Sequence, residues 1–300
     1  MTIKPCQVPG RRAVRPFLHR HIAMVILVCA CQYGTPCHAE PGKSGLEDAI
    51  CGVKEAFVFW LWNSAAGAAD SARVEWIPDI EDVAITSTDG RVLRGYKLRA
   101  THSRDGERPA RGYLLVAQGN AMLADQIIAR FDRFADQGYD VYIFDYRGYG
   151  RSEGKRRLKA ILHDYRVIIK HLDRQSYRER AFYGMSFGGI VLLNALRNQS
   201  GAMSIVIDST PGTLSDYGCP AEHDPVANLP RDTGRLLVMA GAGDRVVKPK
   251  ASRALLDAAE GQGAVVLRDP ELGHPFMDRQ TERRMKIVSR FLTGKGNWHE

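Results

Sequence analysis

The stretch RAFYGMSFGGIVLLNALRNQ, residues 180–199, decides the fold of this chain. It begins with a short apolar run, turns through Gly184-Met185-Ser186-Phe187-Gly188, and continues as an apolar segment of helical length. A Gly-x-Ser-x-Gly motif between a strand and a helix predicts a turn so tight that bulky neighbours of the serine would clash. Such a turn lifts the Ser186 hydroxyl clear of the sheet, at the positive end of the helix. A chance Gly/Ser turn is the alternative, and the strand–helix context argues against it.

Short apolar runs alternate with stretches of helical periodicity around this turn. The runs are YLLVA (113–117), DVYIFD (140–145), SIVID (204–208), RLLVMAG (235–241) and AVVLRD (264–269), and the helical stretches include 124–138, 163–175 and 250–261. Apolar strands alternating with amphipathic helices predict a parallel sheet covered on both faces. Residues 81–100 instead predict two antiparallel strands joined by a turn at Asp89-Gly90. We therefore expect an α/β fold with a mostly parallel central sheet flanked by helices.

Two further residues complete a candidate catalytic triad with the serine. A serine hydroxyl needs a neighbouring base to become a nucleophile, and an acid must hold that base in its working tautomer. His274 lies in the loop ELGHPF after the last apolar run, and Asp244 lies in GAGDRVV after the run before it. The carboxyl ends of parallel strands share one edge of a sheet. We therefore expect Ser186, Asp244 and His274 to meet at this edge, in the chain order Ser…Asp…His.

Other polar residues are weaker candidates for the same roles. Asp208 ends the run SIVID on the adjacent strand and ranks as the competing acid behind Asp244. Glu222 and His223 lie in the next connection, where solvated side chains are commoner than catalytic ones.

Donors for an oxyanion are predicted from the loops beside the serine, each commonly worth about 3 kcal/mol in catalysis. The backbone N–H of Phe187, the residue after the serine, is the first donor. The second is the backbone N–H of Asn120, in the loop Gln118-Gly119-Asn120-Ala121 after the run YLLVA. An ordinary strand-to-helix turn with Asn120 as a helix cap is compatible with the same residues.

Taken together, residues 81–293 resemble the α/β-hydrolase superfamily. The resemblance rests on AQGNA, DYRGYGRSEG, GMSFGG, GAGDRVV and LGH, and is greatest to the branch with an HGNA oxyanion loop and a DYRGYGxS segment. It implies a small serine hydrolase, of a kind often associated with membranes or the cell envelope. Gln118 replaces the His of that loop, and we expect the oxyanion hole to survive because a backbone amide makes the contact. Asp145 and Arg147 would brace loops near the site.

The resemblance and the triad favour hydrolysis of carboxylic esters or thioesters, of small-molecule or lipid-like acyl substrates, through an acyl-enzyme on Ser186. Peptidase or aminopeptidase activity would use the same machinery. A non-catalytic envelope protein on this scaffold predicts a broken triad, whereas every position is filled. No cofactor or metal is expected, because neither HExxH nor GxxxxGK[ST] occurs. The short connection from Ser209 to Arg235 predicts a small or absent lid and hence an open site.

The N-terminus predicts export to a bacterial periplasm or envelope, or secretion. Residues 1–20 are basic without acids, and Ile22–Ala30 form an apolar run too short to cross a bilayer, which requires about 20 residues. Cys37-His38-Ala39 fits signal-peptide cleavage, which would make residues 1–39 the export signal. Val28-Cys29-Ala30-Cys31 alternatively resembles a lipoprotein signal lipidated at Cys31, and an uncleaved anchor or a buried helix is the remaining alternative. A lipidated or anchored N-terminus would associate with the membrane.

Residues 40–80 are expected to form a partly helical segment before the hydrolase-like domain at 81–300. Residues 46–62 predict a helix that either packs on the domain or rests on a membrane surface. Cys51 and Cys219 would be free to pair in an oxidising compartment.

Charge argues against a nucleic-acid partner. The formal net charge is +8, but five basic residues precede residue 40, where no acid occurs, and 8 − 5 leaves only +3 on the rest.

Overall fold

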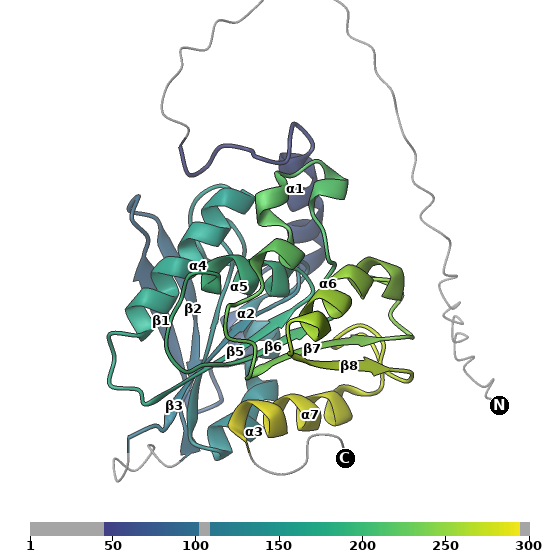
Figure 1. Ribbon diagram of the computed structural model, residues 1–300. Coiled ribbons are helices and arrows are strands. Elements are labelled where there is room, and N and C mark those ends of the chain that lie inside the picture. The colour runs from purple at the N-terminus through teal and green to yellow at the C-terminus, as the bar shows by residue number, and fades with distance from the viewer. Residues whose placement is uncertain (1–44, 102–108, 295–300) are drawn as a thin grey trace, which may run out of the picture. The chain divides into compact units, whose positions relative to one another are not determined.

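One eight-stranded sheet, in the order β1-β2-β4-β3-β5-β6-β7-β8, organises the structure, which is a computed structural model (Figure 1). It describes residues 45–101 and 109–294. The strands span Ile80–Thr86 (β1), Val92–Leu98 (β2), Gly112–Ala117 (β3), Tyr139–Phe144 (β4), Glu179–Met185 (β5), Ser204–Asp208 (β6), Leu236–Gly241 (β7) and Val265–Asp269 (β8). The α-helices span Glu55–Ala66 (α1), Ala124–Ile127 (α2), Asp132–Asp136 (α3), Leu158–Leu172 (α4), Phe187–Leu196 (α5), Pro249–Gly261 (α6) and Thr281–Thr293 (α7).

The pairing of the strands confirms the predicted fold class. β1 and β2 form the expected antiparallel hairpin, with Thr86 opposite Val92 and Gly90 in the left-handed region at φ +83°. β2 is also antiparallel to β4, whereas every pair from β4 through β8 is parallel. Strands β3 to β7 are almost wholly buried, which explains why their sequences read as continuous apolar runs rather than alternating ones.

Helices cover both faces of the sheet and enclose two separate apolar cores. Helices α1, α4, α5 and α6 bury side chains in the core on one face. On the other face, α2, α3 and α7 contribute to the second core. In Figure 1, α4, α5 and α6 accordingly lie on one side of the strands, and α3 and α7 lie on the other. The carboxyl ends of β3, β5, β7 and β8 therefore share one edge, as the crossover rule predicts.

The helix expected over 124–138 is broken, and this expectation was wrong in detail. It consists of α2, a 3-10 helix at Ile128–Phe131, and α3. The tighter 3-10 turn brings residues three apart into line, and here it buries both Ile128 and Phe131 against the second core. The packing of Ile128 and Phe131 therefore decides the backbone conformation here, although the sequence has the periodicity of one continuous helix.

The connection from Ser209 to Arg235 is a small lid, as predicted. It contains three short 3-10 helices, Ser215–Tyr217, Ala221–His223 and Pro225–Asn228, and no α-helix. Asp224 organises its first part, because its carboxylate accepts hydrogen bonds from the backbone N–H groups of Leu214 and Ser215 and from the Ser215 hydroxyl.

The part of the chain before β1 contains α1 and a 3-10 helix at Ser71–Arg73. The Glu55 carboxylate, buried at the start of α1, accepts hydrogen bonds from the backbone N–H groups of Ile50, Cys51 and Leu158. The bonds from Ile50 and Cys51 shape the turn before α1, and the bond from Leu158 ties the start of α1 to the start of α4. No helix among residues 45–101 and 109–294 is long and apolar enough to cross a membrane. The predicted export signal, with Cys31 and the 37–39 cleavage site, lies outside the described residues.

Candidate active site

Ser186 lies at the sharp turn between β5 and α5, in a backbone conformation that non-glycine residues rarely adopt. Its φ is +54° and its ψ is −117°, and its backbone N–H donates to the carbonyl of Asp208 on the neighbouring strand at 2.8 Å. A Cβ at position 188 would lie 1.9 Å from the Ala117 carbonyl oxygen, so only glycine fits there. The local sequence and the close passage of β3 together force the strained turn.

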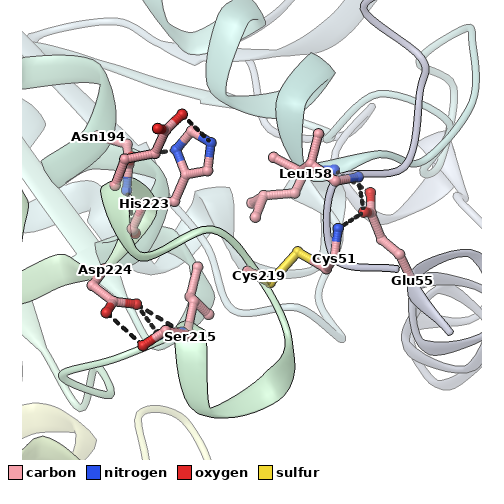
Figure 2. Close-up of a disulfide and its surroundings, with 11 residues drawn as sticks. Cys51, Glu55, Leu158, Asn194, Ser215, Cys219, His223 and Asp224 are labelled. Carbon is pink, nitrogen blue, oxygen red and sulfur yellow. Dashed lines mark hydrogen bonds and ion pairs between the residues drawn. A yellow bond between two sulfur atoms is a disulfide. The ribbon is translucent and has the colours of Figure 1, made fainter. Parts of the chain in front are cut away.

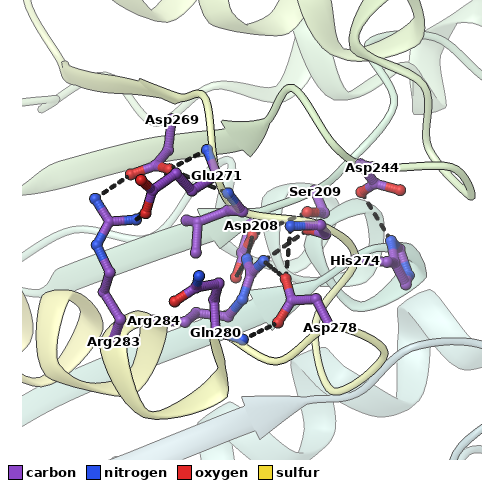
Figure 3. A network of polar contacts seen from close by, with 12 residues as sticks. Asp208, Ser209, Asp244, Asp269, Glu271, His274, Asp278, Gln280, Arg283 and Arg284 are labelled. Atoms are coloured by element: carbon purple, nitrogen blue, oxygen red, sulfur yellow. Dashed lines mark hydrogen bonds and ion pairs between the residues drawn. The ribbon is translucent and has the colours of Figure 1, made fainter.

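Asp244 and His274 form a hydrogen-bonded pair, as Figure 3 shows. The His274 Nδ1 atom lies 2.9 Å from Asp244 Oδ2, and the other carboxylate oxygen accepts from the backbone N–H groups of Val246 and Val247. Burial alone would raise the pKa of Asp244, but these hydrogen bonds and the charge of His274 outweigh it and the pKa lies below its ordinary value. An ionised carboxylate only accepts, so Nδ1 carries the proton and Nε2 is left as the basic nitrogen.

A buried arginine on α7 connects the loop of His274 to the strand beside the nucleophile (Figure 3). Arg284 donates from Nη1 to both carboxylate oxygens of Asp208 at 2.6 and 2.7 Å, and from Nη2 to the carbonyl of Gly273 at 2.6 Å. Asp278 accepts from the Gly273 N–H at 2.6 Å and from Arg284 Nη2 at 3.1 Å. Gly273, which precedes His274, is therefore bound through both its N–H and its carbonyl. Arg284 links this carbonyl to Asp208 on β6, and the backbone carbonyl of Asp208 accepts from the Ser186 N–H.

This network removes Asp208 from the role of competing acid. Besides the two contacts from Arg284, its carboxylate accepts from the Tyr183 hydroxyl at 2.8 Å and from the Ser209 hydroxyl at 3.0 Å. It is fully buried and has no hydrogen bond to His274 among the described residues. Asp208 therefore acts as the carboxylate partner of Arg284. The competing-acid interpretation of this residue was wrong.

The two predicted oxyanion donors lie in the loops that flank Ser186. A Cβ on Gly119 would come within 4.0 Å of Ser186 Cβ, so the loop before α2 passes directly beside the nucleophile. Phe187 is the first residue of α5, where backbone N–H groups have no partner within the helix. Among the described residues, neither the Phe187 nor the Asn120 amide donates a hydrogen bond to another group. Both donors are thus available to a ligand.

Gln118 occupies the place of the histidine that the resemblance implies, and its side chain is used within the loop. The side-chain Nε2 of Gln118 donates to the carbonyl of Phe144 at 2.9 Å. The backbone carbonyl of Gln118 accepts from the Tyr146 hydroxyl at 2.5 Å. Both contacts join the loop after β3 to the end of β4. The amide side chain of Gln118 therefore anchors the loop that carries Asn120.

The segment DYRGYG braces the site from further away. Asp145 Oδ1 accepts from the backbone N–H of Ala124, the first residue of α2. Arg147, fully buried, pairs with Asp164 on α4 and with Asp89 in the hairpin turn. These contacts join three elements that are distant in sequence, and neither side chain contacts the three triad residues.

Comparison with known proteins agrees with this fold. A family model described as serine aminopeptidase, S33, matches residues 108–222. An uncharacterized protein of Mycobacterium tuberculosis is 28% identical over 80% of this chain and 92% of its own length. Among solved structures, the Pyrococcus furiosus esterase Pf2001 aligns with a TM-score of 0.59 at 17% identity, over 76% of this chain and 96% of its own. A Xanthomonas campestris protein described as an a/b serine hydrolase without lid aligns with a TM-score of 0.55 at 17% identity, over 71% and 93%.

This chain has the α/β-hydrolase fold. The likeness to the solved structures shows this fold, and the region that matches the family model includes the loop from Gln118 to Ala121 and the Gly-x-Ser-x-Gly turn.

The three residues of the candidate triad are largely buried, although the lid is short. Ser186, Asp244 and His274 are only 6%, 4% and 7% exposed. Next to Ser186 in the chain, the ring of Phe187 packs 5.6 Å, between centroids, from the Phe59 and Trp62 rings of α1, and we call α1 and the lid together the cover. The aromatic run near the end of residues 46–62 was the only sequence signal for this cover, and it did not indicate what α1 would pack against.

A disulfide joins the segment before α1 to the lid (Figure 2). Cys51 and Cys219, 168 residues apart in sequence, are bonded with Cα atoms 3.9 Å apart. Cys51 directly precedes the turn that leads into α1, and Cys219 lies between two of the short lid helices. The two pieces of the cover, from opposite halves of the chain, are therefore one covalently closed unit.

Proposed function

We propose that the hydrolase cleaves carboxylic ester or thioester bonds of acyl substrates through an acyl-enzyme on Ser186. The observation that carries the proposal is the His274–Asp244 pair at 2.9 Å on the same strand edge as the strained Ser186 turn. The buried, ionised carboxylate of Asp244 keeps the proton of His274 on Nδ1. His274 Nε2 is then free to accept a proton, as a general base must. No cofactor is required for this chemistry.

The reaction would follow from these positions. His274 Nε2 removes the Ser186 hydroxyl proton as the oxygen attacks the acyl carbonyl, and Asp244 stabilises the imidazolium that forms. The Phe187 and Asn120 amides would donate to the tetrahedral oxyanion. The imidazolium then gives its proton to the departing alcohol or thiol, leaving an acyl-enzyme. Water, deprotonated by the same Nε2, attacks this ester and releases the carboxylic acid and free Ser186.

Aminopeptidase-like cleavage is the second candidate, because the matching family model carries that description. The triad chemistry is the same for an amide, with an amine as the leaving group. The aromatic cover of Phe59, Trp62 and Phe187 favours an apolar acyl group over a charged amino terminus, because an ammonium group would lose its hydration there.

A fluorophosphonate probe tests the activated serine, and a substrate panel then separates the two candidates. We expect a covalent adduct at Ser186 in the wild type, none in Ser186→Ala, and full labelling in Ser200→Ala, an exposed control serine. The panel would compare p-nitrophenyl butyrate, a butyryl thioester and an aminoacyl p-nitroanilide. Faster turnover of the anilide would reverse our preference, and an unlabelled but folded wild type would favour a non-catalytic scaffold.

We also propose that the hydrolase is exported. The Cys51–Cys219 disulfide supports this, because structural disulfides persist mainly in oxidising compartments. The basic and apolar N-terminal sequence points the same way. Fractionation of a bacterial host that expresses the full chain tests it: recovery in the reduced state from the cytoplasm would contradict the proposal, and mass spectrometry of the N-terminus would distinguish cleavage from lipidation at Cys31.

A further inference from the structure

We propose that the outer face of α1 docks on the surface of an anionic phospholipid bilayer. The docking itself stands on the observations below, whereas its use, to bring the active site to acyl lipids, rests on the proposed function.

Helix α1 presents two contrasting faces. Its inner face contributes Phe59 and Trp62 to the cover of the site. On its outer face, Phe57, Trp60 and Leu61 are 62%, 52% and 51% exposed. The stacked Phe57 and Trp60 rings, with centroids 5.8 Å apart, make this face continuous. It is therefore a large apolar patch rather than scattered exposed residues, and such patches mark interaction sites.

The composition of this face fits a lipid–water interface. The other exposed positions of α1 are Ala56, Ser64 and Ala65, and the single charged residue of the helix, Glu55, is turned inward and fully used by backbone N–H groups. Trp and Phe are the side chains that prefer the boundary between headgroups and acyl chains. The exposed Val53, just before the helix, extends the apolar face.

A basic groove adjoins the start of α1 and supplies charge complementarity to anionic headgroups. Its volume is about 1040 Å³, and Ser186 is not among the residues that line it. Ile50, beside the Cys51–Cys219 bond, and Pro220, next to Cys219, both belong to its wall. Figure 2 shows His223 and Asn194, also of this wall, on one side of the disulfide and Glu55 of α1 on the other.

The charges of the groove are mostly positive. Its cations are Lys159, Arg166, Lys170, Arg174 and Arg197. Its acids are Asp173 and Glu222, and Asp173 is already bound by Arg180 and by the Tyr113 hydroxyl. Within the described residues, no carboxylate forms an ion pair with Arg166, Lys170, Arg174 or Arg197. A polybasic surface next to an aromatic helix is the combination that holds proteins on anionic membranes, at about 1 kcal/mol per cation close to the surface.

The sequence before α1 also favours attachment to a membrane. If the N-terminus is lipidated at Cys31 or retained as an uncleaved anchor, the membrane attachment precedes Glu55, the first residue of α1, in the same part of the sequence. Docking would then orient a hydrolase that is already tethered. Because Phe59 and Trp62 lie on the opposite side of the same helix, docking would also place the cover of the active site at the lipid surface.

Quenching of tryptophan fluorescence by brominated phosphatidylglycerol vesicles tests this contact in the full chain. We expect strong quenching in the wild type, loss of most of it in Trp60→Phe, and no loss in Trp76→Phe. Trp76 is the matched control, since it is 74% exposed and its neighbour Val74 packs in the core on the other face of the sheet. The chain has four tryptophans, so it is the difference in quenching between the wild type and Trp60→Phe that reports the contact of Trp60. Equal quenching in Trp60→Phe and wild type would overturn the proposal.

Sedimentation with vesicles provides the second measurement. Trp60→Glu should weaken partitioning by about tenfold, whereas Trp76→Glu should not change it. The paired change Lys170→Glu and Arg174→Glu should weaken binding to phosphatidylglycerol but not to phosphatidylcholine. Failure of the folded wild type to bind either vesicle overturns docking alone and points instead to a protein on the α1 face. If the protein binds vesicles but is not labelled by the fluorophosphonate, the proposed hydrolysis is contradicted and the proposed docking is not.

Discussion

Two regions of the molecule meet at Phe187. One is the strand edge with the candidate triad, the other is the cover made by α1 and the lid, and different interactions hold them. At the strand edge, main-chain bonds of the parallel sheet and the buried Arg284 contacts fix the loops of Ser186 and His274. The cover is attached mainly by side chains: the disulfide, Glu55, aromatic contacts, Gln126 Nε2 donating to the Ala66 carbonyl, and Asn194 Nδ2 donating to the His223 carbonyl. The loops of the candidate triad are therefore held chiefly by main-chain bonds and a buried arginine, whereas the cover is held chiefly by side chains.

The largest effect is expected where the strand edge carries the chemistry. Asp244→Asn should lower kcat/KM by about three to four orders of magnitude, because an amide favours the wrong imidazole tautomer. Asp257→Asn, an exposed aspartate that pairs with Arg268, is the control and should be near neutral. Steady-state kinetics on the best ester would check both. A comparable loss in the two variants would contradict the assignment of Asp244.

The next effect tests whether Arg284 holds the strand edge together. Arg284→Met should reduce the free energy of unfolding by about 3–5 kcal/mol, since it strands the buried Asp208 carboxylate. We also expect kcat to fall by at least about tenfold with KM little changed, because the His274 loop loses its contact at Gly273.

The adjacent residue supplies the control for this prediction. Arg283 is half-exposed and pairs with the buried Asp269 carboxylate, which also accepts from the Glu271 and Leu272 N–H groups, so Arg283→Met should cost less stability than Arg284→Met and leave kcat unchanged. Denaturant unfolding and kinetics on both variants separate a positioning role from plain stability. Arg284→Met with a normal kcat at a temperature where it is folded would show that the arginine is structural only.

A smaller effect is expected when the cover loses its covalent link. The double variant Cys51→Ser and Cys219→Ser should lower the free energy of unfolding by about 2–4 kcal/mol, because the bond closes a long loop in the unfolded chain. Turnover of a small soluble ester should persist, since the strand edge does not depend on the bond. A reducing agent should reproduce the change in thermal unfolding of the wild type and leave the variant unaffected. Loss of turnover together with a normal melting curve would show that the cover shapes the site directly.

The smallest effect concerns pH and the brace at Asp145. Burial raises the pKa of Asp145 to about 6, although the N–H groups of Ala124 and Arg151 partly oppose this. The folded state then binds a proton more tightly than the unfolded chain, whose Asp has a pKa of about 3.9, so stability falls as pH rises from about 4 to about 6. Asp145→Asn should remove a change on the order of 2 kcal/mol over this window. Denaturant unfolding at several pH values checks it, and an unaltered slope would contradict it.

Much of the fold was predictable because local patterns carried it. Apolar runs of strand length mark strands buried on both faces, and the Gly-x-Ser-x-Gly turn specifies its own backbone conformation. Ser186, Asp244 and His274 each follow a strand, and the rule that parallel strands end at one edge predicts that they lie at the same edge, where Asp244 and His274 are hydrogen-bonded. The broken helix at 124–138 was missed because burial of Ile128 and Phe131, rather than periodicity, decides its shape.

The sequence by itself determined the sheet, the nucleophile turn and the order of the triad, since these depend on residues close in the chain and on general topology. Only the tertiary structure decided that α1 covers Phe187, that Cys51 bonds to Cys219, and that Asp208 pairs with Arg284 rather than with His274. These contacts join segments far apart in sequence, and no local pattern records which distant side chain will meet another. Packing selects them because a buried charge needs a partner, and an aromatic face needs an apolar one.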